Sequence, residues 1–149
     1  VQAVFFGSSF NVVNHEKTFD EIGRILTPQG WVCTFFNHRD LDDAIQRSIE
    51  SLICSHIPDY DYGVRRSDIS QTLRNSGLFE QVQTDCQTFV VEMRSDDVVE
   101  AWRSHATLRR QCSDDEMFNR IIGEIEQLLP IGTVSVPYTT VCCFAKLQL

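Results

Sequence analysis

The sequence predicts an α/β fold with helices on both faces of a mixed sheet. Continuous apolar runs, typical of strands buried between helix layers, alternate with segments whose apolar residues recur at helical spacing. The expected order is strand, helix, strand, two helices, strand, two helices, strand. The chain has 149 residues, of which 42% are hydrophobic and 23% charged, as in a globular protein of one domain. We therefore expect a single domain over residues 1–149.

The first third of the chain is predicted to be a strand, a helix and a second strand. An apolar run predicts the first strand over residues 2–8. Asn14 is a good N-cap for a helix that extends to about Leu26, because Phe19 and Ile22 fall on the same face as Leu26. A turn with Pro and Gly and a second apolar run follow, over residues 27–30 and 31–37.

Two helices and a long strand are expected in the middle of the chain. Asp40 is the expected N-cap of a long helix, which Pro58 stops. Its apolar stripe consists of Leu41, Ile45, Ile49, Leu52 and Ile53. Ser67 is the expected N-cap of a shorter helix through Leu73, and a long strand is expected over residues 79–93.

Two further helices and a last strand complete the chain. Ser95 is the expected N-cap of a helix that carries Val98, Val99, Trp102 and Ala106. Ser113 and Glu116 have the spacing of a capping box for the next helix, which Pro130 ends. The last strand is expected over residues 133–149. Four strands are fewer than a doubly wound domain usually has, so the sheet is expected to be incomplete.

The net charge of the chain limits the classes of partner that it is expected to bind. Its formal net charge is −8, whereas nucleic acids and anionic membrane surfaces are bound by clustered Lys and Arg. We therefore expect neither partner, and favour a small molecule, a cation or another protein.

The six cysteines are scattered through apolar runs, without a CxxC pair or a histidine at ligand spacing, at Cys33, Cys54, Cys86, Cys112, Cys142 and Cys143. We expect reduced structural cysteines in a cytoplasmic protein rather than a zinc site or a disulfide framework. No apolar run approaches the ~20 residues of a membrane span, and no basic leader precedes the first apolar run. Because the chain opens directly into a strand without an initiator Met, we interpret it as a piece of a larger protein.

The stretch over residues 2–30 resembles the middle of the class I methyltransferases that use S-adenosylmethionine. That family has an apolar strand, a turn of small residues, and a helix that ends in an E-I-x-R-x-L-x-P-x-G signature before the next strand. The signature is matched here by Glu21, Ile22, Arg24, Leu26, Pro28 and Gly30. Ser76-Gly77-Leu78-Phe79 also resembles the family's entry to its sixth strand.

The resemblance implies a partial Rossmann-like sheet formed by strands four to seven of the family. The last strand would insert antiparallel between the fifth and sixth, and the two helices over about 95–130 would be an inserted lid. The family's glycine-rich loop, which holds most of the cofactor, has no counterpart in the sequence. The resemblance therefore implies the substrate-side half of a methyltransferase that is inactive without its glycine-rich half.

The resemblance also implies where S-adenosylmethionine would lie in the full-length parent. The turn after the first strand would pass along the methionine part of the cofactor, and consists of Gly7, Ser8, Ser9 and Phe10. A plain strand-to-helix turn is the alternative, since Gly and Ser are common there. Asn37 and His38 end the next strand and face the same crevice as candidate substrate contacts. The presence of Asn37 and His38 at this position is explained equally well by a helix cap and by solvated charges.

Further candidate residues lie in the predicted lid and loops. Trp102 and Arg103 are candidate substrate contacts, although the helical spacing of Trp102 also fits a core position. His105 and His15 are candidate general bases. The alternative for His105 is a solvated side chain, and the alternative for His15 is a local cap of the helix. The loop with Tyr60, Tyr62, Arg65 and Arg66 could bind an anionic substrate, with Tyr62 as the contact. No metal site is expected.

Two classes of function fit these observations. The first is a small-molecule methyltransferase, and the second is a non-catalytic methyltransferase-like module for dimerisation or docking. If the first three family strands are absent, the apolar strand over 2–8 lies at an open sheet edge. We therefore expect self-association, most simply a homodimer through this N-terminal strand.

Overall fold

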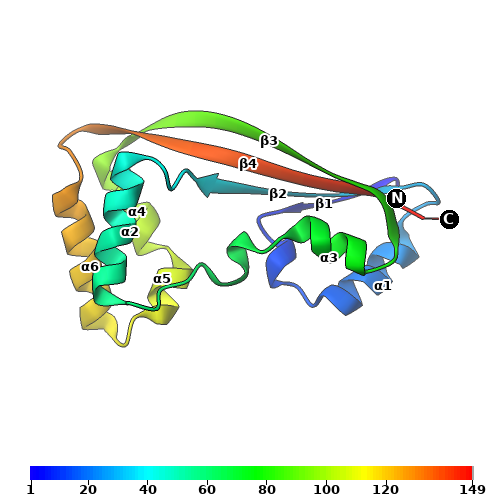
Figure 1. The fold of residues 1–149 in the computed structure, drawn as a ribbon, viewed down its shortest axis with the longest axis horizontal. Coiled ribbons are helices and arrows are strands. Elements are labelled where there is room, and N and C mark those ends of the chain that lie inside the picture. The colour runs from blue at the N-terminus through cyan, green and yellow to red at the C-terminus, as the bar shows by residue number, and fades with distance from the viewer. Residues whose placement is uncertain (149) are drawn as a thin grey trace. The chain divides into compact units, whose positions relative to one another are not determined.

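The computed structural model describes residues 1–148, except for the side chain of residue 65. The chain forms two compact units, each built from several segments (Figure 1). The first unit contains residues 1–38, 64–88 and the chain from residue 139 onward. The second contains residues 39–63 and 89–138. The elements over 95–130, predicted as an inserted lid, therefore belong to the second unit together with the segment over 39–63.

The described strands form one four-stranded sheet with the order β1-β2-β4-β3. The strands are β1 (Ala3–Gly7), β2 (Trp31–Arg39), β3 (Phe79–Arg94) and β4 (Thr133–Leu147). Strands β1 and β2 are parallel, with Ala3 paired to Trp31 and Gly7 to Phe35. The last strand thus lies between β2 and β3, as the methyltransferase resemblance implied.

Strand β4 runs antiparallel to both of its neighbours, as Figure 1 shows. Next to β2, the hydroxyl of Thr140 donates to Oδ1 of Asn37 at 2.8 Å, whereas the backbone N–H of Leu147 donates to the carbonyl of Gly30. Next to β3, the ring of Phe89 stacks on Tyr138, and the hydroxyl of Ser135 donates to the carboxylate of Glu92. In each pair the residue numbers rise on one strand as they fall on the other. The predicted mixed α/β sheet with an antiparallel last strand is confirmed.

The first unit packs its helices on one side of its strands. Helices α1 (His15–Ile25) and α3 (Ile69–Asn75) and the short 3₁₀ helix η1 (Phe10–Val12) contribute to a single apolar core with β2 and β4. The residues of this core are Phe10, Ile22, Leu26, Val32, Phe36, Leu73, Phe79, Cys143 and Ala145. Removing such apolar area from water, at about 25 cal/mol per Å², is the main force that holds α1 and α3 in place.

The alternate side chains of β1, β2 and β4 form a second face of the first unit. Phe5 is 66% exposed and Phe35 36% exposed, and their rings lie 6.3 Å apart. Trp31 and Phe144 pack on the same face, with ring centroids 6.0 Å apart. Among the described residues of this unit, neither α1 nor α3 covers these side chains, so we call them the uncovered face.

The second unit is a cluster of helices packed against residues 89–94 of β3 and residues 133–138 of β4. It contains α2 (Ala44–His56), α4 (Ser95–Arg103), α5 (Ala106–Gln111) and α6 (Asp115–Leu128), with α6 packed against α2 and α4. Trp102 and the Ile residues of α2 and α6 fill its core. Strand β4 contributes Val134 and Val136 here but Cys143 and Ala145 to the first unit. Strand β4 therefore contributes side chains to the cores of both units.

The helices begin close to the predicted positions, but several N-caps were predicted wrongly. Helix α2 is capped by Asp43, whose carboxylate accepts from the backbone N–H groups of Ile45 and Gln46, and not by Asp40. Asp68 replaces Ser67 at α3, and Asp114 replaces Ser113 at α6. In each case the carboxylate nearest the first turn accepts the orphan N–H groups, and at α3 and α6 an ionised oxygen does so more strongly than the predicted serine hydroxyl would.

The single helix predicted to begin at Ser95 and to carry Ala106 was also wrong in its length. Helix α4 ends at Arg103, and α5 begins at Ala106 with His105 as its N-cap. The hydroxyl of Ser95 donates to the carbonyl of Pro130 instead of capping α4. No helix among residues 1–148 has both the length and the apolar character needed to cross a membrane.

Candidate functional site

The turn after β1 has a backbone conformation that is uncommon outside glycine. Ser8 has a φ of 48°, and its backbone N–H donates to the carbonyl of Phe35 at 2.8 Å. A non-glycine residue in this region is strained by about 1–2 kcal/mol, and such strain gathers at ligand sites and switches. Gly7 precedes it as the last residue of β1. This turn lies at the carboxyl end of a parallel strand, where ligands bind in open α/β sheets.

The residues after this turn anchor it rather than face solvent. The side chain of Phe10 is fully buried, so it belongs to the core and leaves Gly7, Ser8 and Ser9 as the accessible part of the turn. The amide of Asn11 is buried and donates to the carbonyl of Val64 at 3.1 Å. Sequence reasoning missed Asn11, which fixes the turn to the segment that precedes α3.

His15 packs against the same turn. Its ring stacks on Phe10 with centroids 4.9 Å apart, and its Nε2 lies 3.0 Å from the carbonyl oxygen of Phe10. A ring nitrogen facing a carbonyl must carry the proton, so neutral His15 keeps its lone pair on Nδ1. The structure therefore gives His15 a local anchoring contact and leaves its role as a base a prediction.

His38 lines a small cavity of the first unit, of about 90 Å³. Asn37, its neighbour on β2, points the other way and accepts from Thr140. The ring of His38 stacks on Phe36 with centroids 6.1 Å apart. The cavity is lined by Thr34, Phe36, His38, Ser67, Asp68, Ile69, Ser70, Thr84, Val141 and Cys143. A space of this size holds a few waters or a small polar group.

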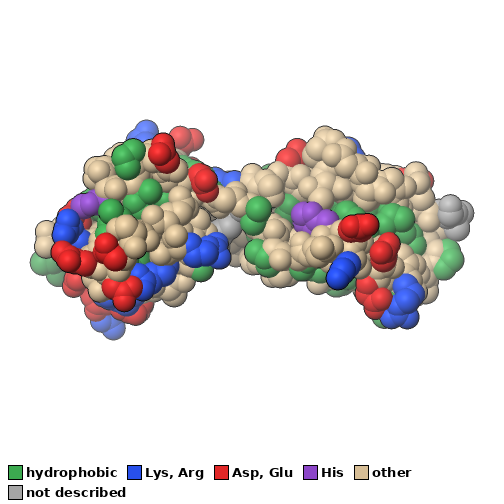
Figure 2. All heavy atoms as spheres, turned by 90° about the horizontal axis from the view of Figure 1, so that it is seen from below, with side chains coloured by type: hydrophobic (Ala, Val, Ile, Leu, Met, Phe, Trp, Pro, Cys, Tyr) green, Lys and Arg blue, Asp and Glu red, His purple; other side chains and the backbone are tan. Residues whose placement is uncertain are grey.

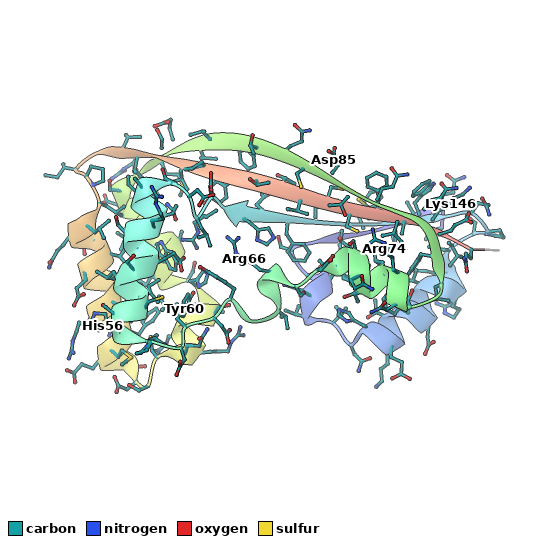
Figure 3. All side chains as sticks on the ribbon, viewed as in Figure 1. His56, Tyr60, Arg66, Arg74, Asp85 and Lys146 are labelled. Atoms are coloured by element: carbon teal, nitrogen blue, oxygen red, sulfur yellow. The ribbon has the colours of Figure 1, made fainter. Side chains whose placement is uncertain are left out.

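Asp68 contributes a carboxylate to the lining of this cavity. The pKa of its carboxyl is lowered, because it accepts from the hydroxyl of Ser70 and from the backbone N–H of Gln71. Arg74, labelled in Figure 3, donates to Ser70 at 2.8 Å and so adds a positive charge near the rim. Asp68, Thr34 and Thr84 were missed from the sequence. The signal available for Thr34 was its polar side chain inside an apolar run.

Trp102 and its neighbours form an aromatic group inside the second unit. Trp102 is 1% exposed and belongs to the core of that unit. The guanidinium of Arg39 lies 3.8 Å from the ring centroid of Trp102, a cation–π contact. His105 lies beside the same ring, with centroids 4.9 Å apart, and its Nδ1 accepts from the backbone N–H of Leu108. While it caps α5 in this way, neutral His105 carries its proton on Nε2.

The remaining predicted contacts lie on other parts of the second unit. Tyr62 donates to Glu50 at 2.8 Å and packs edge-on against Tyr60, which Figure 3 labels. Arg103 is 45% exposed and pairs with Glu100 on its own helix at 3.0 Å. Its neighbour Trp102 is buried, so adjacent positions of α4 face the core and the solvent. The side chain of residue 65, predicted with this loop, lies outside the described residues.

The two units thus hold different parts of the predicted site. The first unit brings together Gly7, Ser8, Ser9 and His15, and holds the cavity that His38 lines. The second unit brings Trp102 and His105 together. The cysteines include three half-buried thiols and one buried thiol, and burial raises the pKa of Cys112 and Cys143. No group of three or more metal-ligating side chains is found among the described residues.

Comparison with known proteins gives matches in structure only. No protein-family model and no curated protein matches the sequence. A proposed type II methyltransferase from Anaeromyxobacter dehalogenans is similar, with a TM-score of 0.62 and 11% identity over 98% of this chain and 64% of that one. The chain has part of the methyltransferase fold.

Weaker likenesses extend to other methyltransferase structures. One is a proposed methyltransferase from Bacillus halodurans, with a TM-score of 0.45 and 15% identity over 99% of this chain and 64% of that one. Another is phosphoethanolamine N-methyltransferase 2 of Haemonchus contortus in complex with S-adenosyl-L-methionine, with a TM-score of 0.40, 12% identity, and coverage of 99% and 33%. The chain spans less than two thirds of the length of each of these three structures.

Proposed function

We propose that the chain is the substrate-side part of an S-adenosylmethionine-dependent methyltransferase that acts on a small molecule. The observation that carries the proposal is the strand order β1-β2-β4-β3 with β4 antiparallel, which the sequence resemblance had implied. The strained turn at Ser8 supports it, because the strain lies at the carboxyl end of β1, where the resemblance places the methionine part of the cofactor.

The cofactor would contact the turn mainly through its backbone and hydroxyls. Gly7 and Ser8 are exposed, whereas the side chain of Phe10 is buried and supports the turn from below. Ser9 accepts from the backbone N–H of Val12, which shapes the turn into η1. These residues supply few contacts for so large a cofactor, so the chain by itself is expected to bind it weakly and to be inactive.

When bound, the cofactor would supply a sulfonium methyl group, whose carbon the acceptor attacks in line while the carbon–sulfur bond breaks and S-adenosylhomocysteine leaves. The protein's task is then to hold the acceptor ~3–3.5 Å from that methyl carbon and to exclude water. A base is needed only where the acceptor must lose a proton. His15 is the better placed of the two predicted bases, because its Nδ1 keeps a lone pair while Nδ1 of His105 is used in a cap.

A small-molecule substrate fits the charge of the chain. The net charge is −8, and acidic and basic side chains are interspersed over the face in Figure 2, without a continuous basic patch on that face. Among the proposed substrate contacts, His38 lines the cavity of the first unit and Tyr62 is half-buried in the second. Asn37 and Arg103 are exposed, whereas Trp102 is buried and its ring is in contact with the guanidinium of Arg39.

A two-part binding and transfer experiment tests this proposal. Calorimetry with S-adenosylhomocysteine compares this chain with a longer protein that carries it together with a glycine-rich first half. We expect micromolar binding by the longer protein, at least 100-fold weaker binding by the chain, and methyl transfer from labelled S-adenosylmethionine only by the former. A longer protein that neither binds the cofactor nor transfers methyl groups would refute the catalytic proposal.

The alternative is a non-catalytic dimerisation or docking module, and the uncovered face favours it. Phe5 is 66% exposed on β1, which is an edge strand, and Phe35 lies beside it. Unpaired backbone groups on an edge strand and exposed aromatic rings both favour association. We propose that two copies pair through β1 as a two-fold homodimer, which is compatible with either function.

A further inference from the structure

Two cysteines lie in contact on neighbouring strands of the first unit. Cys33 is on β2 and Cys142 on β4, and their Sγ atoms are 3.4 Å apart. Because Thr34 faces Cys143 across the two strands, the two thiols are diagonal neighbours on one face of an antiparallel pair. A disulfide needs an S–S distance of about 2.05 Å, so a shift of about 1.4 Å in side chains and strands would close the bond.

The surroundings leave this pair accessible and separate it from the other thiols. Both sulfurs belong to half-buried residues on the uncovered face, between the pair Trp31 and Phe144 and the ring of Phe35. Cys143 follows Cys142 directly but points to the opposite face, where it is 2% exposed in the core. A small oxidant can therefore reach Cys33 and Cys142 without opening the core.

We propose that Cys33 and Cys142 form a redox-sensitive pair that peroxide converts to a disulfide, locking β4 onto β2. One thiol attacks hydrogen peroxide, becomes a sulfenic acid and releases water. The second sulfur then displaces the hydroxyl from that sulfenic acid, so that an S–S bond forms and a second water leaves. In sum, two thiols and one peroxide give one disulfide and two waters. A dithiol reductant reverses the reaction by thiol–disulfide exchange.

The surroundings of Cys33 make its thiol slow to react with an oxidant near neutral pH. Burial, and next the neighbouring Cys142, raise the pKa of the Cys33 thiol to about 12. The thiolate is the reactive form, so Cys33 reacts slowly near neutral pH and faster as the pH rises. The bond would close a loop of 109 residues between the two positions, and cross-links of such long loops restrict the unfolded chain most strongly.

Peptide mapping of the chain before and after peroxide treatment tests the proposal. For this experiment Cys54→Ser and Cys86→Ser are introduced into the chain, because these two exposed thiols could join separate molecules. We expect a mass loss of about 2 Da, a tryptic cross-link between the Cys33 and Cys142 peptides, and a Tm raised by about 10 °C. Dithiothreitol should reverse all three, and the oxidation rate should rise with pH.

Matched variants separate this pair from its neighbours. Cys143→Ser should keep the cross-link, and fragmentation of the linked peptide between residues 142 and 143 identifies the bonded sulfur. Cys142→Ser should abolish both the cross-link and the rise in Tm. A bond that uses Cys143 or Cys112, or free alkylation of Cys33 and Cys142 after peroxide treatment, would overturn the proposal. Peptide mapping of the Cys54→Ser, Cys86→Ser chain shows by itself which two cysteines are joined, so the test stands even if Cys142→Ser or Cys143→Ser fails to fold.

Discussion

The backbone N–H of Ser8 donates to the carbonyl oxygen of Phe35 at 2.8 Å, and this bond belongs to the last residue pair between β1 and β2, Gly7 with Phe35. Ser8 is held at a φ of 48° as a result. The pairing energy of two strands therefore maintains a backbone conformation that a serine does not adopt by preference. The strained residue is also the one at which the proposed cofactor turn begins.

Replacing Ser8 should reveal this strain in the stability of the chain. Ser8→Gly should raise the free energy of unfolding by about 0.5–1 kcal/mol, because glycine adopts a positive φ without a steric penalty. Ser8→Val should lower it by more than about 1 kcal/mol. Urea denaturation measures both, and Ser9→Gly, at a φ of −131°, is the control that should bring no gain. Equal effects at the two serines would contradict the account.

Phe5→Asp should prevent self-association. The wild-type chain is expected to scatter light as a particle of about twice its 17.1 kDa mass. The variant places a charge on the apolar edge, so its particle should have the mass of one chain. Val12→Asp is the matched control, because Val12 is 72% exposed but lies outside the strands. Wild-type protein that stays monomeric at high concentration would refute the dimer.

The adjacent residues Trp102 and Arg103 should differ sharply in their effect on stability. Trp102→Ala leaves a cavity in the core of the second unit and should cost about 3–5 kcal/mol. Arg103→Ala removes an exposed ion pair with Glu100 and should change stability by less than about 0.5 kcal/mol. Thermal and denaturant unfolding measure this, and comparable losses at both positions would show that Trp102 is not the core residue described.

Asp68 should make the stability of α3 depend on pH at the acid end. Its folded-state pKa is lowered, so its stabilising contribution is present above the unfolded pKa of about 4 and is lost as the pH falls through the folded value. Asp68→Ala should cost about 1 kcal/mol at pH 7 and less at pH 2.5. Asp68→Asn, which retains an accepting oxygen, is the control. A pH-independent cost would show that its charge has no role.

The positions of the N-caps illustrate what a linear sequence leaves open. Ser67 and Asp68 are both good capping residues at neighbouring positions, and the sequence does not decide between them. The backbone decides, because only the residue whose φ and ψ are extended just before the first turn can direct its side chain back to the helix N–H groups. Asp68 has that conformation, with ψ near 98°. His105 shows the same effect, since it caps α5 at a position that the apolar spacing had placed inside one continuous helix.

The candidate site was predictable only in part. The turn at Gly7 and Ser8 was predicted as part of the site because a short motif and the end of a strand coincide there, and its role in binding stays a prediction. The cavity beside His38 was not found, because it is assembled from α3 and three strands that are distant in the chain. No local pattern indicates that Thr34, Asp68 and Thr84 face one space.

The sequence by itself determined the order and type of the elements, because apolar periodicity reports directly whether a segment is buried as a strand or as a helix. It also contained the signature from which the strand order could be inferred by resemblance. Only the tertiary structure decided which side chains meet: Phe35 with Ser8, Cys33 with Cys142, and Trp102 with Arg39. These contacts depend on strand register and helix packing between segments far apart in the chain, and residue spacing within one segment carries no information about them.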